Sequence, residues 1–172
     1  MEATTSAQAP ATAAAEAAKR DFDALQKRDP DAMKAAYAEH AVVDFVPLGL
    51  VLRGNEELRR FFFELFAAVP DLETTYDVVA TSGDAAVVEY HMRGTHLGSF
   101  QGVDATGKHL EIRGCDVMHV EGDLIVRNTA YYDQMSMVRQ IGMMPAQDSG
   151  AEKAMKSAFN AATKLRARLA QR

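Results

Sequence analysis

The chain has 172 residues, of which 48% are hydrophobic and 25% charged, and its formal net charge is −5. This length suits one packed domain and is short for two, and the composition is that of a soluble globular protein. The acidic charge argues against a nucleic-acid-binding domain, which would need a basic face. The single cysteine, Cys115, excludes an internal disulfide framework and fits a reducing compartment.

The N-terminal segment has no basic stretch followed by an apolar core, so it is not expected to be a secretory signal. No apolar run approaches the roughly 20 residues that a membrane-spanning helix needs. We therefore expect a cytoplasmic protein without a membrane partner. Residues 1–12 are rich in Ala, Thr and Ser, and we expect them to form a disordered lead-in to a domain over residues 13–146.

The first part of the domain has helical periodicity. A helix is predicted from Ala13, and "RDPDAMKAAYAEH" restarts one, with Asp29 suited to the N-cap and Pro30 to the first turn. Its apolar stripe is Met33, Ala36 and Tyr37. The short strand "AVVDFVP" follows. A third helix then begins after Gly54 and ends at Pro70, with a wide apolar face formed by Leu58, Phe62, Leu65, Phe66 and Val69.

The second part of the domain has strand periodicity. Residues 72–94 predict a hairpin that turns at 82–84, a loop spans 95–108, and a second hairpin runs from 109 to 133. "QMSMVRQIGMMP" closes the domain as a turn or short helix. Helices followed by strands indicate an α+β fold, in which an antiparallel sheet is covered on one face by the helices. Such a sheet leaves a concavity between the two layers.

The tail over residues 150–172 is a separate, basic amphipathic helix. Its apolar side is formed by Met155, Phe159, Ala162, Leu165 and Leu169. Docking to a partner and binding to an anionic membrane surface are both compatible with this pattern. We favour a third interpretation, in which the helix folds onto its own or a sister subunit.

The second hairpin, "GCDVMHVEGDLIVRNTAYYDQ", carries two carboxylates in runs that are otherwise apolar. A two-residue turn at Gly122–Asp123 sets the register and predicts which side chains share a face. One face is predicted to hold Gly114, Asp116, Met118, Ile125, Thr129, Tyr131 and Asp133. On this register Asp116 and Asp133 face one cavity but lie about 13 Å apart, too far to share a proton.

A carboxyl group in an apolar cavity has a raised pKa and can move protons next to a carbonyl group, chemistry that needs no metal and no cofactor. Structural alternatives remain open, because Asp133 could cap the following turn and Asp116 could pair with Arg127. The histidines lack metal-ligand spacing on a common face. They are His40, His91, His96, His109 and His119. His119 is predicted on the face opposite the aspartates, and Cys115 as a packed thiol.

Several phrases are similar to the SnoaL-like polyketide cyclase family of the nuclear transport factor 2-like group. They are "RDPDAMKAAYAEHAVV", "RGNEELRRFFFELFAAVPDL", "RGTHLGSFQGVDATGKHLEIRGCDVMHVEGDLIV" and "YYDQMSMVRQIGM". The resemblance runs from about Ala18 to Pro145. It implies a cone-shaped, strongly curved antiparallel sheet wrapped around the N-terminal helices, with a hydrophobic pocket inside. It also implies a homodimer, and the tail helix is an addition to this fold.

The resemblance also implies roles for single residues. In the family's cyclases an aspartate near the end of the last strand is the acid/base of an aldol ring closure, and Asp133 is similar to it. A histidine one strand earlier assists in some members, where His119 falls. Asp116 resembles the protonated aspartate of the ketosteroid isomerases. The likeness to the isomerases does not extend to their other catalytic residues. The position of the isomerase base falls next to Phe45, and that of the isomerase tyrosine falls near Asp21.

We therefore predict a cofactor-independent cyclase or isomerase that acts on a hydrophobic, polyketide-like carbonyl compound. Asp133 would move the proton and His119 would assist, Asp116 and Tyr131 would donate hydrogen bonds to the developing enolate, and the pocket would be shaped by Phe62, Phe66 and Met118. The alternative is a module on the same fold that binds small ligands or serves in assembly without catalysis. A cavity filled by Arg127 or by the tail helix would favour that alternative.

Overall fold

One curved, six-stranded sheet forms the body of the protein, in the order β2-β1-β6-β5-β4-β3. The structure is a computed structural model and describes residues 12–170. The strands are β1 (Tyr37–Phe45), β2 (Leu50–Arg53), β3 (Glu73–Ser82), β4 (Ala85–Thr95), β5 (His109–Glu121) and β6 (Leu124–Tyr132). Strands β1 and β6 run parallel, and the other neighbours are antiparallel. The α+β fold with a curved sheet is thus confirmed, with one parallel pair that the sequence did not predict.

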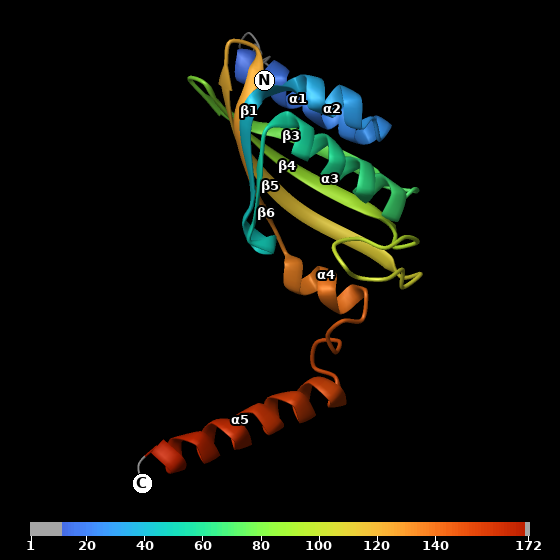
Figure 1. Ribbon diagram of the computed structural model, residues 1–172, viewed down its shortest axis with the longest axis vertical. Coiled ribbons are helices and arrows are strands. Elements are labelled where there is room, and N and C mark those ends of the chain that lie inside the picture. The colour runs from blue at the N-terminus through green and yellow to red at the C-terminus, as the bar shows by residue number, and fades with distance from the viewer. Residues whose placement is uncertain (1–11, 171–172) are drawn as a thin grey trace, which may run out of the picture.

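Three helices lie against the concave face of the sheet (Figure 1). They are α1 (Ala13–Lys27), α2 (Pro30–Ala36) and α3 (Asn55–Ala68). Asp29 caps α2 as predicted, since its carboxylate accepts from the backbone amides of Asp31 and Ala32 at 3.1 and 3.0 Å. A short 3₁₀ helix, η1 (Val46–Leu48), connects β1 to β2.

The predicted extension of α2 through Tyr37 is wrong. The helix ends at Ala36, and Tyr37 begins β1, where it pairs with Ile125 of β6. Tyr37 follows Met33 at helical spacing, which is why the sequence pattern placed it on the same apolar stripe. The long-range pairing between β1 and β6 decides the local conformation instead.

The β5–β6 hairpin has the predicted two-residue turn but not the predicted register. Glu121 lies opposite Leu124 and Val120 opposite Ile125, after which a β-bulge at Val126 shifts the pairing. From His119 back towards the start of β5, even-numbered residues of β5 lie opposite even-numbered residues of β6. Asp116 therefore lies opposite Ala130. Since side chains alternate along a strand, this shift turns every β6 side chain beyond the bulge to the other face.

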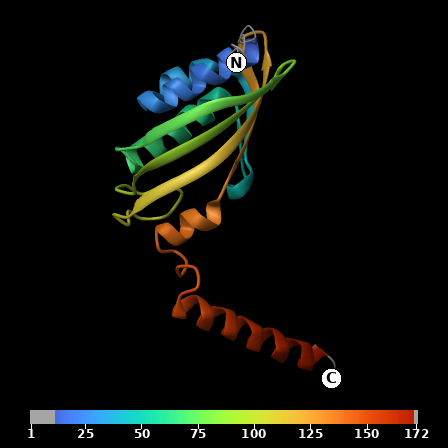
Figure 2. The ribbon, with the colours of Figure 1, turned by 180° about the vertical axis from the view of Figure 1, so that it is seen from behind.

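The last two helices have different surroundings. Helix α4 (Gln134–Gln140) follows β6 directly and lies beneath the end of the sheet, whereas α5 (Gly150–Ala170) projects away from the domain (Figures 1 and 2). The predicted tail helix is present up to Ala170. The predicted lead-in over residues 1–12 lies outside the described residues, apart from Thr12, which caps α1. Among the described helices, none has the length and hydrophobicity needed to cross a membrane.

Candidate active site

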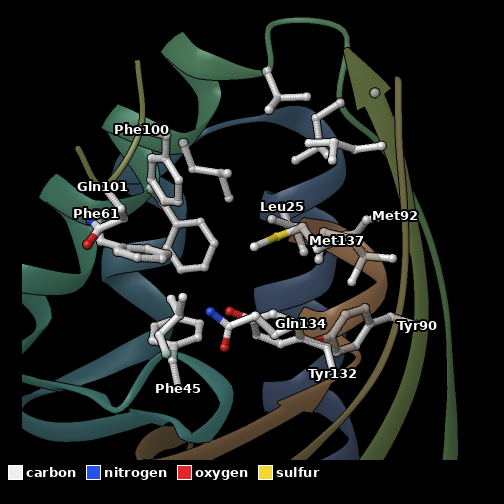
Figure 3. Close-up of a pocket in the computed structure, with 18 of the residues that line it drawn as sticks. Leu25, Phe45, Phe61, Tyr90, Met92, Phe100, Gln101, Tyr132, Gln134 and Met137 are labelled. Carbon is white, nitrogen blue, oxygen red and sulfur yellow. The ribbon is translucent and has the colours of Figure 1, made fainter. Parts of the chain in front are cut away.

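A cavity of about 300 Å³ lies between the concave face of the sheet and the helices. Figure 3 shows Phe61 and Phe100 on one side of this space and Tyr90 and Tyr132 across it. The rest of its lining is mostly apolar and includes Phe22, Leu25, Phe45, Phe62, Met92, Ile112 and Met137. A concave, mostly apolar site with a few convergent polar groups is typical of small-molecule binding.

A chain of hydrogen bonds joins two buried carboxyl groups that line this cavity. The Tyr37 hydroxyl donates to Asp21 Oδ2 at 3.1 Å. Asn128 Nδ2 donates to Asp116 Oδ2 at 2.8 Å and to the Tyr37 hydroxyl oxygen at 3.2 Å. Asp21 comes from α1, Tyr37 from β1, Asp116 from β5 and Asn128 from β6, so the site depends on the assembled fold. All four are at least 90% buried.

Burial raises the pKa of both carboxyl groups into the neutral range. Desolvation raises the pKa of Asp116 to about 7, although hydrogen bonds from Asn128 and Tyr90 oppose the shift. Desolvation and the nearby charge of Asp116 raise the pKa of Asp21 to about 8, against the hydrogen bond from Tyr37. Burial also raises the pKa of Tyr37 well above its ordinary value, so this hydroxyl stays a neutral donor.

Within the described part of the chain, Asp21, Asp116 and Asn128 each have one side-chain oxygen without a hydrogen-bond partner. Asp21 Oδ1, Asp116 Oδ1 and Asn128 Oδ1 are buried, and they have no hydrogen-bond partner among the described residues. A buried polar atom without a partner costs roughly 1–3 kcal/mol, so several at one place need an explanation. A bound ligand would provide such an explanation. Its hydroxyl group would donate to one of these oxygens, or its carbonyl group would accept from a protonated carboxyl group.

Two of the predicted site residues line the cavity, namely Asp116 and Phe62. Phe66 packs behind Phe62, with ring centroids 5.8 Å apart, and Met118 is fully buried in the core. Neither Phe66 nor Met118 belongs to the cavity lining.

The bulge at Val126 overturns the predicted shared face of Asp116 and Asp133. Tyr131 lies on the outer face and is 49% exposed, and Asp133 is exposed and absent from the cavity lining. The Asp133 carboxylate instead accepts from the Ser136 amide at 2.9 Å and caps α4, the structural alternative foreseen above. His119 is half-buried and lies 3.6 Å from the Asp84 carboxylate.

The groups that could have blocked the cavity do not fill it. Arg127 is exposed and is the cross-strand partner of His119. These two side chains lie on the face of the hairpin that is opposite to Asp116, so Arg127 is not the partner of Asp116. Helix α5 projects away from the sheet (Figure 2), and none of its residues lines the cavity. A cavity filled by Arg127 or by the tail helix would have favoured a structural role for the carboxyl groups. Neither Arg127 nor α5 fills it.

The sequence interpretation missed Asp21, Tyr37, Tyr90 and Asn128 as site residues. A signal existed for Asp21, because it falls on the apolar stripe of α1. The other members of that stripe are Ala14, Ala17, Ala18, Phe22 and Leu25. A carboxylate on such a stripe must be buried. Asn128 could not be placed in the cavity without knowledge of the bulge.

Tyr90 reaches the network because its cross-strand neighbour is a glycine. Gly114 lies directly opposite Tyr90, and the tyrosine ring and hydroxyl occupy the space that a Cβ at position 114 would need. Burial, followed by the charge of Asp116, raises the pKa of Tyr90 far above its ordinary value, so its hydroxyl group stays neutral. Within residues 12–170 no group of three or more His, Cys, Asp or Glu side chains is arranged to hold a metal ion.

Solved structures with this architecture come from several bacteria. A candidate SnoaL-like polyketide cyclase from Jannaschia sp. CCS1 has a TM-score of 0.71 and 21% identity, over 80% of this chain and 98% of that one. IdmH, a candidate polyketide cyclase from Streptomyces antibioticus, has a TM-score of 0.62 and 23% identity, over 73% and 96%. A protein of ketosteroid isomerase-like fold from Catenulispora acidiphila, solved with trimethylamine, has a TM-score of 0.63 and 17% identity, over 74% and 92%.

These likenesses define the class of fold, the ketosteroid isomerase-like or nuclear transport factor 2-like cone. A comparison with curated proteins finds no match. The family model for the SnoaL-like polyketide cyclases matches residues 15–141, which include the whole hydrogen-bonded network. The chain therefore belongs to the SnoaL-like polyketide cyclase family, as its sequence predicts.

Proposed function

We propose that this protein is an acid/base catalyst of the cyclase or isomerase type that acts on a hydrophobic carbonyl compound without a cofactor. One observation carries the proposal: two buried carboxyl groups, each with an oxygen that has no hydrogen-bond partner among the described residues, line one apolar cavity and have pKa values of about 7 and about 8. A pair of this kind holds about one proton near pH 7.5. It therefore offers a base and an acid at the same time.

The difference between the two pKa values assigns the roles. Asp116, with the lower pKa, is the carboxylate that removes a proton from the carbon next to the substrate carbonyl. Asp21, with the higher pKa, is the protonated partner whose free oxygen, Oδ1, donates a hydrogen bond to the carbonyl oxygen as it becomes an enolate. Tyr37 and Asn128 hold the other oxygen of each carboxyl group. The apolar walls keep water away and so strengthen these hydrogen bonds.

The products of that step are an enolate and a protonated Asp116. In an isomerisation, Asp116 would return the proton to a different carbon of the same molecule. In a ring closure, the enolate carbon would attack a second carbonyl group of the molecule, and the new alkoxide would take the proton from Asp116. Both reactions leave the protein unchanged, and the cavity of about 300 Å³ admits a compact substrate.

Asp133 remains the alternative proton carrier that the family resemblance implies. Against it stand its exposure and its contact with the Ser136 amide, whereas its neighbours Tyr132 and Gln134 do line the cavity. Asp116→Asn and Asp133→Asn variants distinguish these two possibilities.

The proposal predicts catalysed exchange of carbon-bound protons. In deuterated buffer near pH 7.5, the protein should accelerate deuterium uptake at the carbon between the carbonyl groups of an aromatic β-diketone, measured by proton NMR. The Asp21→Asn/Asp116→Asn double variant is the control and should show only the background rate. If an aromatic β-diketone binds to the wild type and its exchange rate stays at background, the protein is a ligand-binding module and the catalytic proposal fails.

A further inference from the structure

Helix α5 lies outside the family match and has a continuous apolar face without a partner in the described structure. Its large apolar side chains are exposed, with Met155 at 41%, Phe159 at 69%, Leu165 at 59% and Leu169 at 61%. Glu152 is its only buried residue, and it ties the first turn to Arg139 of α4 at 2.6 Å. Most of a helix's stability in a protein comes from packing of its apolar face, and the apolar face of this 21-residue helix has no packing partner among the described residues.

The sequence of α5 follows the seven-residue repeat of a coiled coil. Positions a and d, the two that face the partner helix, hold only apolar or small residues. Positions a are Met155, Ala162 and Leu169, and positions d are Ala151, Ala158 and Leu165. Lys153, Lys156 and Lys164 fall at the outward positions b, c and f. The apolar face is therefore a coiled-coil seam that is free of charge along three repeats.

We propose that the α5 helices of two copies of this chain pair in antiparallel orientation along this seam. The pairing is self-complementary when the two helices cross at residue 160. Met155 then lies opposite Leu165 of the second copy, Ala158 opposite Ala162, and Ala151 opposite Leu169. Phe159, at a flanking position, lies beside Phe159 of the second copy and covers the middle of the seam.

Charge favours the antiparallel orientation over the parallel one. Arg166 and Arg168 flank the seam near the C-terminal end, so parallel helices would bring the arginines of both copies together. Residues 1–149 contain 13 Lys or Arg and 23 Asp or Glu, a net charge of −10. Antiparallel helices place the basic end of each α5 beside the acidic domain of the other copy. The projection of α5 away from its own domain leaves room for this (Figure 1).

Disulfide trapping in the full-length protein tests both the pairing and its direction. In a Cys115→Ser background, Met155→Cys chains are mixed with Leu165→Cys chains and oxidised mildly. Antiparallel pairing predicts a disulfide between the two variants, while Met155→Cys chains alone remain unlinked. Linked Met155→Cys chains would indicate parallel pairing and overturn the proposal, as would the absence of any link at concentrations where the wild type associates.

Sedimentation equilibrium measures the contribution of the seam. Leu165→Glu places a charge at a d position and should weaken the α5-dependent association at least tenfold. Asn160→Glu adds the same charge at an outward position and should change it less than twofold, and circular dichroism checks that both helices persist. Equal association of the two variants would contradict the proposal. Sedimentation of the wild type with phosphatidylserine vesicles, without α5-dependent association, would assign the apolar face to a lipid surface and overturn it.

Discussion

Asp116→Asn is expected to lower the rate of catalysed α-proton exchange at least 100-fold at pH 7.5. The amide keeps the shape of the side chain and can still contact Asn128, but it cannot accept a proton from carbon. Loss of a positioned general base typically costs 10²–10⁴-fold in rate. The measurement is the rate of deuterium uptake into the same β-diketone by proton NMR, with ligand affinity determined separately for each variant.

Asp133→Asn is the matched control for this prediction. Asparagine is as good an N-cap as aspartate, so α4 should remain intact, and exchange should stay within about threefold of the wild type. The opposite ranking, with Asp133→Asn inactive and Asp116→Asn active, would transfer the role of base to Asp133. It would also require the end of β6 to turn its carboxylate into the cavity when substrate binds.

The free energy of unfolding is expected to fall by several kcal/mol between pH 5 and pH 8. Asp21 and Asp116 have ordinary pKa values near 3.8, which the fold raises to about 8 and about 7. Between pH 4 and pH 8 the folded chain therefore binds more protons than the unfolded chain. The stabilising effect of these two carboxyl groups is complete below pH 4. It is lost as the pH rises through their pKa values in the folded state. Each pKa unit corresponds to about 1.4 kcal/mol.

Variants isolate this contribution from that of the other titrating groups. The Asp21→Asn/Asp116→Asn double variant should lose most of the slope and be more stable than the wild type at pH 8, whereas Asp133→Asn should retain the slope. Urea denaturation at pH 5 and pH 8 measures all three chains. Asp31, Glu56, Asp71 and Glu152 have lowered pKa values, so their opposite contributions fall mainly below pH 5. Wild-type stability that increases from pH 5 to pH 8, with the double variant unchanged, would refute this prediction.

Local signals in the sequence were sufficient for most of the fold. Asp29 and Pro30 mark the start of α2, Pro70 follows the end of α3, and Gly83 and Gly122 lie in the turns of the two hairpins. Each of these residues has a backbone or capping preference that acts within a few positions of the chain. The family resemblance then gave the curvature of the sheet, which no local pattern contains.

The site was only partly predictable, because two of its determinants are not local. The bulge at Val126 has no glycine or proline to announce it, yet it decides which β6 side chains face the cavity, bringing in Asn128 and leaving out Tyr131. Tyr37 has helical spacing and becomes a strand residue only through its pairing with β6. Asp21 was visible as a carboxylate on an apolar stripe, and such an exception to a pattern marks a candidate functional residue.

A carbon-13 NMR titration of the aspartate carboxyl groups tests the central claim most directly, with Asp21→Asn and Asp116→Asn spectra to assign the signals. Two carboxyl groups should titrate near pH 7 and pH 8, and both should shift when an aromatic β-diketone is added. Titration of both groups near pH 4, unaffected by the ligand, would mean that they lie in contact with water and hold no proton at neutral pH. The acid/base mechanism would then be abandoned, and only the fold and family would stand.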